Sequence, residues 1–489
     1  MKNIKNIVVI AFATVGILAT SSCKKFFDIN QDPDSVLSAP IKQQLTSLTV
    51  NLGFYAGSDM NRNTSLIMQQ FSGQSSGTLN ATQLYERYLI QGTDLNNAWG
   101  TLYATILNDA ENIITKATAE GSPHYSGVAK IMKAYAYQTS VDIWGDIPFS
   151  EAQKLTDNLQ PKYDPSESIY TGLITLLDQG IAEVNATASI ESPGTNSTIY
   201  PGPFSSSKAN WIKFANTLKL RIFLHYSEKD PAFAKAQIDQ LIASGAPLIS
   251  SNEDGFQMFF TSEAGNQNPI EQYATARAGY LVANNFMVNL MNVNVDPRRA
   301  SYFTEFPEGS GLYKGSVSGA SPSQNYSKFH EYLRGDYDAI DDFYSGAAPI
   351  RMLTFAEYNF MRAEAALRFN SAGSAQDFFQ AGIVASMNDA GVSAADRAAY
   401  ILAHGVLTGT PAQRLQQIIN EKYVASFGVL GESWTDWRRT GYPTIAIAAE
   451  AVTSFIPRSL FYPQTETSLN PNAKQKTSMD ARVFWDVRP

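Results

Sequence analysis

The chain has 489 residues, of which 44% are hydrophobic and 17% are charged, and its formal net charge is −8. This balance predicts a globular protein with a large core, because disordered chains have fewer apolar residues and more net charge. The acidic surface argues against a nucleic-acid-binding protein, since negative side chains repel phosphates. The four histidines (His124, His225, His330 and His404) are far apart in sequence, so we predict neither a metal site nor a cofactor.

Residues 1–22 have the features of a secretory signal peptide. Two lysines precede an apolar run over residues 7–20, which is shorter than the roughly 18 residues that a membrane-spanning helix needs. The single cysteine of the chain, Cys23, follows small residues directly after this run and cannot form an internal disulfide. The arrangement resembles a bacterial lipobox, which predicts lipidation of Cys23 and a tether over residues 23–40. The alternative is an ordinary cleaved signal with an incidental cysteine.

Patterns that begin helices recur through the rest of the chain. Asp164, Asp230, Thr354 and Thr410 each place a side-chain oxygen before a helical stretch. Proline or glutamate follows each of them at a position that favours the first turn of a helix. These signals predict a mostly α-helical protein.

One of the predicted helices has the spacing of a helical repeat. Trp211, Phe214, Ala215 and Leu218 approximate the large-small-large pattern of paired helices in tetratricopeptide repeats. An ordinary helical bundle explains the same spacing, because any amphipathic helix has this periodicity. The spacing alone leaves both architectures open.

Residues 250–350 differ from the segments on either side of them. They contain many aromatic residues without an apolar stripe of helical periodicity, and residues 305–325 are rich in Gly, Ser and Pro, which is typical of loops. We therefore predict an irregular, loop-rich insertion in the helical scaffold.

Several short segments carry a recognisable signature in a fixed order. They are residues 23–30 (CKKFFDIN), 133–137 (KAYAY), 142–149 (DIWGDIPF), 211–221 (WIKFANTLKLR), 420–423 (NEKY) and 432–443 (ESWTDWRRTGYP). Together they resemble the SusD/RagB-like (SusD-like) family, the nutrient-binding outer-membrane lipoproteins of Bacteroidetes. The resemblance spans nearly the whole chain.

The resemblance implies a fold and a function. The expected fold is a single domain over residues 41–489, with a tetratricopeptide-like α scaffold and an irregular ligand-binding insertion. It is expected to dock on a SusC-like TonB-dependent transporter. The expected protein is lipid-anchored in the outer membrane at the cell surface, and it captures oligosaccharides for that transporter. Relatives capture peptides, so a RagB-like peptide-binding lipoprotein is an alternative.

Two segments imitate active sites. Glu432 and Asp436 are paired carboxylates beside tryptophans, as in a glycoside hydrolase, but the neighbouring arginines favour a structural framework. Residues 73–77 (GQSSG) match the pattern of a hydrolase nucleophile without the strand before it and the helix after it that such a turn needs. We predict a binding protein and no enzyme. A glycoside hydrolase and a structural adaptor that binds only a protein partner are the alternatives.

A glycan-binding site needs exposed aromatic faces with polar side chains around them. The residues that we predict to contact the ligand are Tyr273, Arg277, Tyr280, Tyr326 and His330 in the insertion, and Tyr85, Tyr88 and Trp99 in residues 60–99. Packing in the core is the alternative for each aromatic residue, and it is favoured most for Trp99, because an apolar stripe continues from it.

Overall fold

The computed structural model of the chain describes residues 39–75, 77–154, 157–320 and 325–488. The chain divides into two units, Met1–Pro40 and Ile41–Pro489, and nearly all of the described residues belong to the second. Cys23, the predicted signal peptide and all but the last two residues of the predicted tether lie outside the described residues.

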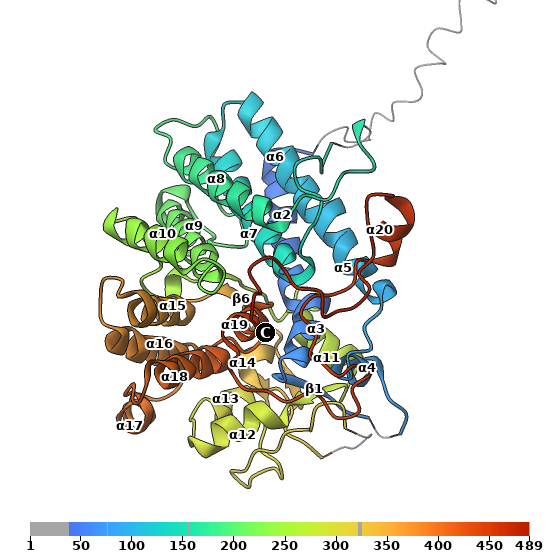
Figure 1. Cartoon of the computed structure of the whole chain (residues 1–489), viewed down its shortest axis with the longest axis vertical. Coiled ribbons are helices and arrows are strands. Elements are labelled where there is room, and N and C mark those ends of the chain that lie inside the picture. Colours follow the sequence, from blue (N-terminus) through green and yellow to red (C-terminus); the bar gives the residue numbers. More distant parts are fainter. Residues whose placement is uncertain (1–38, 76, 155–156, 321–324, 489) are drawn as a thin grey trace, which may run out of the picture. The chain divides into compact units, whose positions relative to one another are not determined.

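Helices make up most of the second unit (Figure 1), which confirms the predicted fold class. Before the insertion they are α2 (Ile41–Gly57), α3 (Asp59–Ile67), α4 (Ala81–Glu86), η1 (Gly92–Leu95), α5 (Asn96–Gly100), η2 (Thr101–Ile106), α6 (Leu107–Ala119), α7 (Pro123–Trp144), α8 (Ser166–Val184), α9 (Phe204–His225) and α10 (Pro231–Ala243). After it they are α15 (Phe355–Phe369), α16 (Ala375–Asp389), α17 (Ala394–His404), α18 (Pro411–Ala425), α19 (Glu432–Thr440) and α20 (Gln464–Leu469).

Successive long helices pack side by side, as a helical-repeat scaffold requires. Helix α7 contacts α6 and α8, α9 contacts α8 and α10, and α15 contacts α16 and α18. Helix α7 is buried on nearly all sides. It can approach α8 closely because a Cβ atom at Gly127 would lie 2.7 Å from the carbonyl oxygen of Gly180, a separation that no larger residue could adopt.

Helix α9 holds the start of the insertion in place. The ring of Phe214 stacks on Phe256 with a centroid distance of 3.6 Å and an interplanar angle of 9°. The Nζ atom of Lys213 lies 2.8 Å from an Oδ atom of Asp254. The repeat-like segment around Trp211 therefore packs against the insertion as well as against its neighbouring helices.

Three of the predicted helix starts are confirmed. The side-chain oxygens of Asp230, Thr354 and Thr410 each accept a hydrogen bond from the N–H group three residues later. Each bond satisfies a donor that the first turn of a helix leaves without a partner.

The fourth predicted cap is wrong. Helix α8 begins at Ser166, but the carboxylate of Asp164 accepts hydrogen bonds from the N–H groups of Phe149 and Ser150 instead. The N–H group of Ser166 donates to Oδ1 of Asp146 over 2.7 Å. The Gly-Asp-x-Pro turn after α7 thus caps the helix that packs on α7.

We expect Asp146→Ala to lower the free energy of unfolding by about 1 kcal/mol, the typical cost of losing a helix cap. Urea denaturation followed by circular dichroism would measure the change. Asp146→Asn is the matched control, because its side-chain oxygen can still accept the bond from Ser166. Equal losses in both variants would mean that the charge of Asp146, rather than the cap, stabilises α8.

The insertion contains short helices and strands rather than loops alone. They are η4 (Asn252–Asp254), β2 (Phe256–Met258), α11 (Pro269–Ala276), β3 (Leu281–Ala283), α12 (Asn285–Val293), α13 (Arg299–Tyr302), α14 (Glu331–Arg334), β4 (Tyr337–Asp338), β5 (Phe343–Tyr344) and β6 (Ile350–Leu353). Elements this short give no periodic signal in the sequence.

The strands form three antiparallel pairs, β1–β3, β2–β6 and β4–β5. Strand β1 (Phe71–Gly73) precedes the insertion, and its Gly73 lies opposite Leu281 of β3. Strand β2 pairs with β6, so the two ends of the insertion meet. The β1–β3 pair brings the segment after β1 next to the segment before β3, although about 200 residues separate them in the sequence.

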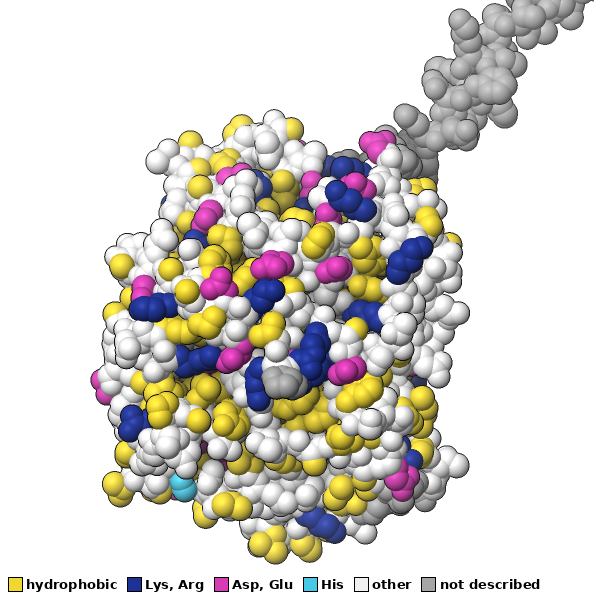
Figure 2. All heavy atoms as spheres, in the orientation of Figure 1, with side chains coloured by type: hydrophobic (Ala, Val, Ile, Leu, Met, Phe, Trp, Pro, Cys, Tyr) yellow, Lys and Arg dark blue, Asp and Glu magenta, His cyan; other side chains and the backbone are white. Residues whose placement is uncertain are grey.

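The surface carries charges of both signs. On the face in Figure 2, basic and acidic side chains lie next to one another. Within the described ranges, no helix is long and apolar enough to cross a membrane. The same ranges hold no group of three or more His, Cys, Asp or Glu side chains arranged as metal ligands.

Candidate ligand-binding site

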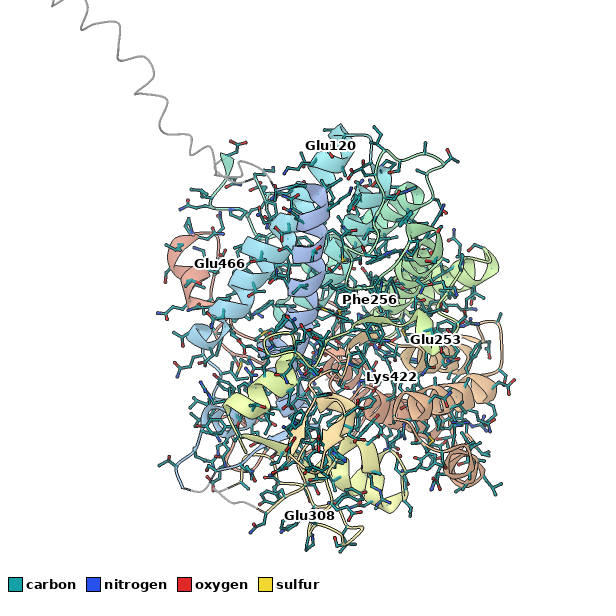
Figure 3. All side chains as sticks on the ribbon, turned by 180° about the vertical axis from the view of Figure 1, so that it is seen from behind. Glu120, Glu253, Phe256, Glu308, Lys422 and Glu466 are labelled. Carbon is teal, nitrogen blue, oxygen red and sulfur yellow. The ribbon has the colours of Figure 1, made fainter. Side chains whose placement is uncertain are left out.

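The paired carboxylates of α19 are not an active site. Glu432 and Asp436 are 3% and 2% exposed, and Nζ of Lys422 lies 2.7 Å from Oε1 of Glu432 and 2.9 Å from Oδ2 of Asp436. Lys422 lies in the interior of the molecule (Figure 3). Burial alone would raise the pKa of Glu432, but Lys422 and Arg221 hold it well below its ordinary value. A glycosidase acid needs a raised pKa and access to the sugar, so this cluster is framework.

The hydrolase-like segment does not form a nucleophile turn either. A strand, β1, does end at Gly73, contrary to our expectation. Helix α4 begins only at Ala81, where Asn80 caps it by accepting the N–H group of Gln83 over 3.1 Å. Ser75 therefore lies in a loop between a strand and a distant helix, whereas a nucleophile serine must lie on the strand-to-helix turn itself.

Four of the predicted ligand-binding residues come together around α11. The guanidinium carbon of Arg62, in α3, lies 3.9 Å from the ring centroid of Tyr273. Burial raises the pKa of Tyr85 to about 12, and Arg62 opposes that rise. Burial also raises the pKa of Tyr273. The charges of Arg62 and Arg277 oppose that rise, and the hydroxyl of Tyr280 adds to it. The two predicted regions are thus one surface, made of Tyr85, Tyr273, Arg277 and Tyr280.

Backbone pairing holds this surface together. Next to the β1–β3 pair, the carbonyl oxygen of Tyr280 accepts hydrogen bonds from the N–H group of Gln74 over 3.3 Å and from the hydroxyl of Thr82 over 3.0 Å. The loop before α4 and the turn after α11 therefore have a fixed relative position. Such a rigid support suits a ligand-binding site.

A pocket of about 440 Å³ lies between these two segments. Its volume is within the range of roughly 300–1,000 Å³ that is usual for small-molecule sites. The lining residues are Gln74, Ser75, Gly77, Thr78, Leu79, Asn80, Ala278, Gly279 and Tyr280. The polar character and position of the pocket make it the candidate ligand-binding site.

Gly279 determines how closely the two sides of the pocket approach. A Cβ atom at this position would lie 3.1 Å from Nε2 of Gln74, and the φ angle of Gly279 is +75°. Both the contact and the left-handed backbone favour glycine. Glycine at this position therefore allows the Gln74 amide to lie against the opposite wall.

Tyr326 and His330 belong neither to the pocket lining nor to the surface made of Tyr85, Tyr273, Arg277 and Tyr280. Tyr326 lies near Nζ of Lys314, which is 5.3 Å from its ring centroid. The Nδ1 atom of His330 is 2.8 Å from the hydroxyl of Tyr344, and burial lowers the pKa of His330. Contact of Tyr326 and His330 with a ligand remains a prediction.

Two further predictions are corrected by the structure, because both side chains belong to the core. Tyr88 is 1% exposed, and its hydroxyl accepts the N–H group of Ala448 over 3.0 Å. Trp99 is 6% exposed and packs edge-on against Trp144 at 5.2 Å, in line with the apolar stripe that follows it. Neither ring has a face available to a sugar.

Most of the pocket lining was not predicted. Gln74 and Ser75 belong to the hydrolase-like segment, 73–77, for which we predicted no ligand contact. The run of Gly, Ser, Thr and Asn over residues 72–80 was the available signal, because such runs form surface loops and loops carry binding sites.

Comparisons with known proteins identify the family of the chain. Residues 28–463 match the SusD-like family profile described as "Starch-binding associating with outer membrane". The chain belongs to the SusD-like family. No curated protein matches it.

Solved structures share the SusD-like fold. A chitin-binding protein is 25% identical with a TM-score of 0.77, and the match covers 92% of this chain and 100% of that one. A chitin-binding SusD homologue from Flavobacterium johnsoniae is 22% identical, with a TM-score of 0.76 and coverage of 92% and 99%. A SusD homologue from Bacteroides uniformis is 24% identical, with a TM-score of 0.73 and coverage of 91% and 99%.

Proposed function

We propose that this SusD-like protein captures oligosaccharides at the cell surface and delivers them to a SusC-like TonB-dependent transporter of the outer membrane. The family match over residues 28–463 is the observation that carries the proposal. The chitin-binding protein of similar fold supports a glycan as the ligand. In this proposal Cys23 carries the lipid anchor, and the protein catalyses no reaction.

The pocket and the aromatic surface beside it suit capture of a sugar chain. Tyr280 supplies an aromatic wall against which the C–H face of a sugar ring can pack. Arg62 covers one face of Tyr273, so Tyr273 and Tyr85 form the half-buried support next to the pocket. Arg277 is exposed, directly before Ala278 of the lining in the sequence, and can donate hydrogen bonds to sugar hydroxyls.

We expect Tyr280→Ala to weaken oligosaccharide binding by at least about tenfold, the effect of losing about 1.4 kcal/mol of contact energy. Calorimetry of the chain from Lys24 onwards, which keeps every described residue, would measure it with chitohexaose, maltoheptaose, cellohexaose and a set of peptides. Saturable binding of an oligosaccharide without its hydrolysis is the result expected.

Tyr326→Ala is the matched control, because it removes a tyrosine of the insertion that does not line the pocket. It should leave the affinity within about twofold. Weakened binding by Tyr326→Ala together with unchanged binding by Tyr280→Ala would place the site at the surface around Tyr326. Binding of peptides alone, or of no probe at all, would reject the proposal in favour of peptide capture or of an adaptor that binds only a protein partner.

A further inference from the structure

Among the described residues, the nine that line the pocket carry no charge. They comprise two amide side chains, a serine, a threonine, a tyrosine and four small or apolar residues. This contrasts with the surface beside the pocket, where Arg62 forms an ion pair with Asp59. A ligand group that enters the pocket therefore leaves water without gaining a charged partner from the lining.

One polar side chain of the lining has unused hydrogen-bonding capacity. Gln74 is 8% exposed, and among the described residues its side-chain amide makes no hydrogen bond. Side-chain amides with so little exposure are normally paired, so an unpaired amide in the lining of a pocket indicates a ligand that completes it.

The other amide of the lining is already occupied. Nδ2 of Asn80 donates to the carbonyl oxygen of Gln74 over 2.6 Å, and its Oδ1 accepts the N–H group of Gln83 as the cap of α4. Asn80 therefore shapes the loop, while the amide of Gln74 and the hydroxyl of Tyr280 are the groups available to a ligand.

The available groups set the chemistry of the ligand. An amide offers a donor and an acceptor, and a hydroxyl offers both as well. They match a sugar hydroxyl or acetamido group, which also donates and accepts. A carboxylate only accepts, so it would leave the Gln74 carbonyl oxygen without a donor and would be buried without a cation, which costs several kcal/mol.

We propose that the pocket binds a neutral sugar residue of the captured chain through Gln74 and Tyr280, and that it rejects uronic acids and sulfated sugars. This inference rests on the proposed oligosaccharide capture and names the class of glycan. Arg277, three residues before Tyr280, is the charged residue closest to it in the sequence. It is exposed and lies outside the lining, so solvent screens its attraction for an anion.

Pairs of neutral and oxidised oligosaccharides with the same glycosidic chain test whether the pocket prefers neutral sugars. The chain from Lys24 onwards is titrated calorimetrically with chitohexaose, maltoheptaose and cellohexaose. It is also titrated with C6-oxidised maltoheptaose and cellohexaose, in which uronic acids replace glucose. The neutral parent of at least one oxidised pair should bind at least about tenfold more tightly than its oxidised form, a difference of about 1.4 kcal/mol. Equal or tighter binding of the oxidised form would overturn the inference and leave oligosaccharide capture standing.

Gln74→Ala tests the assignment to this pocket. It should weaken binding of the neutral probe by at least about tenfold, because it removes both hydrogen-bonding atoms of the amide. Gln43→Ala is the matched control. Gln43 is exposed in the first turn of α2, about 20 Å along that helix from the end that leads to α3. Unchanged affinity in Gln74→Ala, with thermal unfolding like that of the control, would overturn the role of this pocket. Failure of all neutral and oxidised probes to bind would instead reject oligosaccharide capture itself.

Discussion

Arg439→Leu is expected to lower the free energy of unfolding by about 3–5 kcal/mol, because it removes one cation and three hydrogen bonds from the buried carboxylates of Glu364 and Asp436. Arg439 is fully buried, and its Nη1 and Nη2 atoms lie 2.6 and 2.8 Å from the two carboxylate oxygens of Glu364. Its Nη2 atom also donates to Asp436 over 2.8 Å. Urea denaturation at pH 7 would measure the loss.

The ion pair between Arg439 and Glu364 also makes the free energy of unfolding depend on pH. Burial would raise the pKa of Glu364, but the charge and hydrogen bonds of Arg439 lower it to about 2 from the ordinary value of 4.5. A lowered folded-state pKa gives stability that is present above pH 4.5 and is lost as the pH falls toward 2. Arg439→Leu should therefore reduce the loss of stability that the native protein shows on acidification over this window.

Two further variants distinguish the effect of losing this ion pair from the effect of removing any arginine. Arg414→Leu removes an exposed arginine of α18 and should change stability by no more than about 0.5 kcal/mol. Glu364→Gln introduced into Arg439→Leu should restore part of the loss, because a neutral amide is less costly to bury than an unpaired carboxylate. A double variant less stable than Arg439→Leu would contradict this explanation.

The sequence predicts those features that depend on neighbouring residues. The caps at Asp230, Thr354 and Thr410 are confirmed because donor and acceptor lie three residues apart, within one turn. The cap of α8 was assigned to Asp164, since its true partner, Asp146, is 20 residues away and belongs to another turn. Local pattern rules contain no information on that contact.

In the candidate site, too, residue types could be predicted from the sequence, whereas contacts between distant residues could not. Tyr85 and Tyr273 could be named as polar-aromatic candidates from composition, but the contact of Arg62 with Tyr273 depends on the packing of α3 near α11. Tyr88 was a wrong prediction because exposure is a property of the tertiary fold, and its neighbour Ala448 is 360 residues away. Gln74 was missed because an amide is recognisable as unpaired only when its surroundings are known.

The second large effect that we expect concerns the carboxyl group behind the pocket. Glu86, at the end of α4, is 1% exposed and accepts a hydrogen bond from the hydroxyl of Ser72 in β1. Burial raises its pKa to about 8, and bonds from Ser72 and from the backbone of Gly73 and Gly319 only partly oppose that rise. The carboxyl group of Glu86 is therefore neutral at pH 7. In this form it links α4 to β1, the two elements on either side of the pocket loop.

Glu86→Gln should stabilise the protein by several kcal/mol at pH 8 and by little at pH 4.5. In the native protein the unfolded carboxyl ionises near pH 4.5, while the folded one keeps its proton to about pH 8. A raised folded-state pKa gives stability that is complete below pH 4.5 and falls by about 1.4 kcal/mol per pH unit until pH 8. Glutamine keeps the acceptor oxygen and does not ionise, so it removes this loss.

Urea denaturation of both proteins at pH 4.5, 6 and 8 would reveal the difference as a gap that widens with pH. Glu120→Gln is the charge control, since Glu120 follows α6 on the exposed surface (Figure 3), and it should shift stability by no more than about 0.5 kcal/mol. A gap that stays constant from pH 4.5 to 8 would mean that Glu86 is ionised in the folded protein throughout. In that case a counter-charge near β1 and α4 would have to stabilise it, because hydrogen bonds alone do not offset the burial of a carboxylate at this depth.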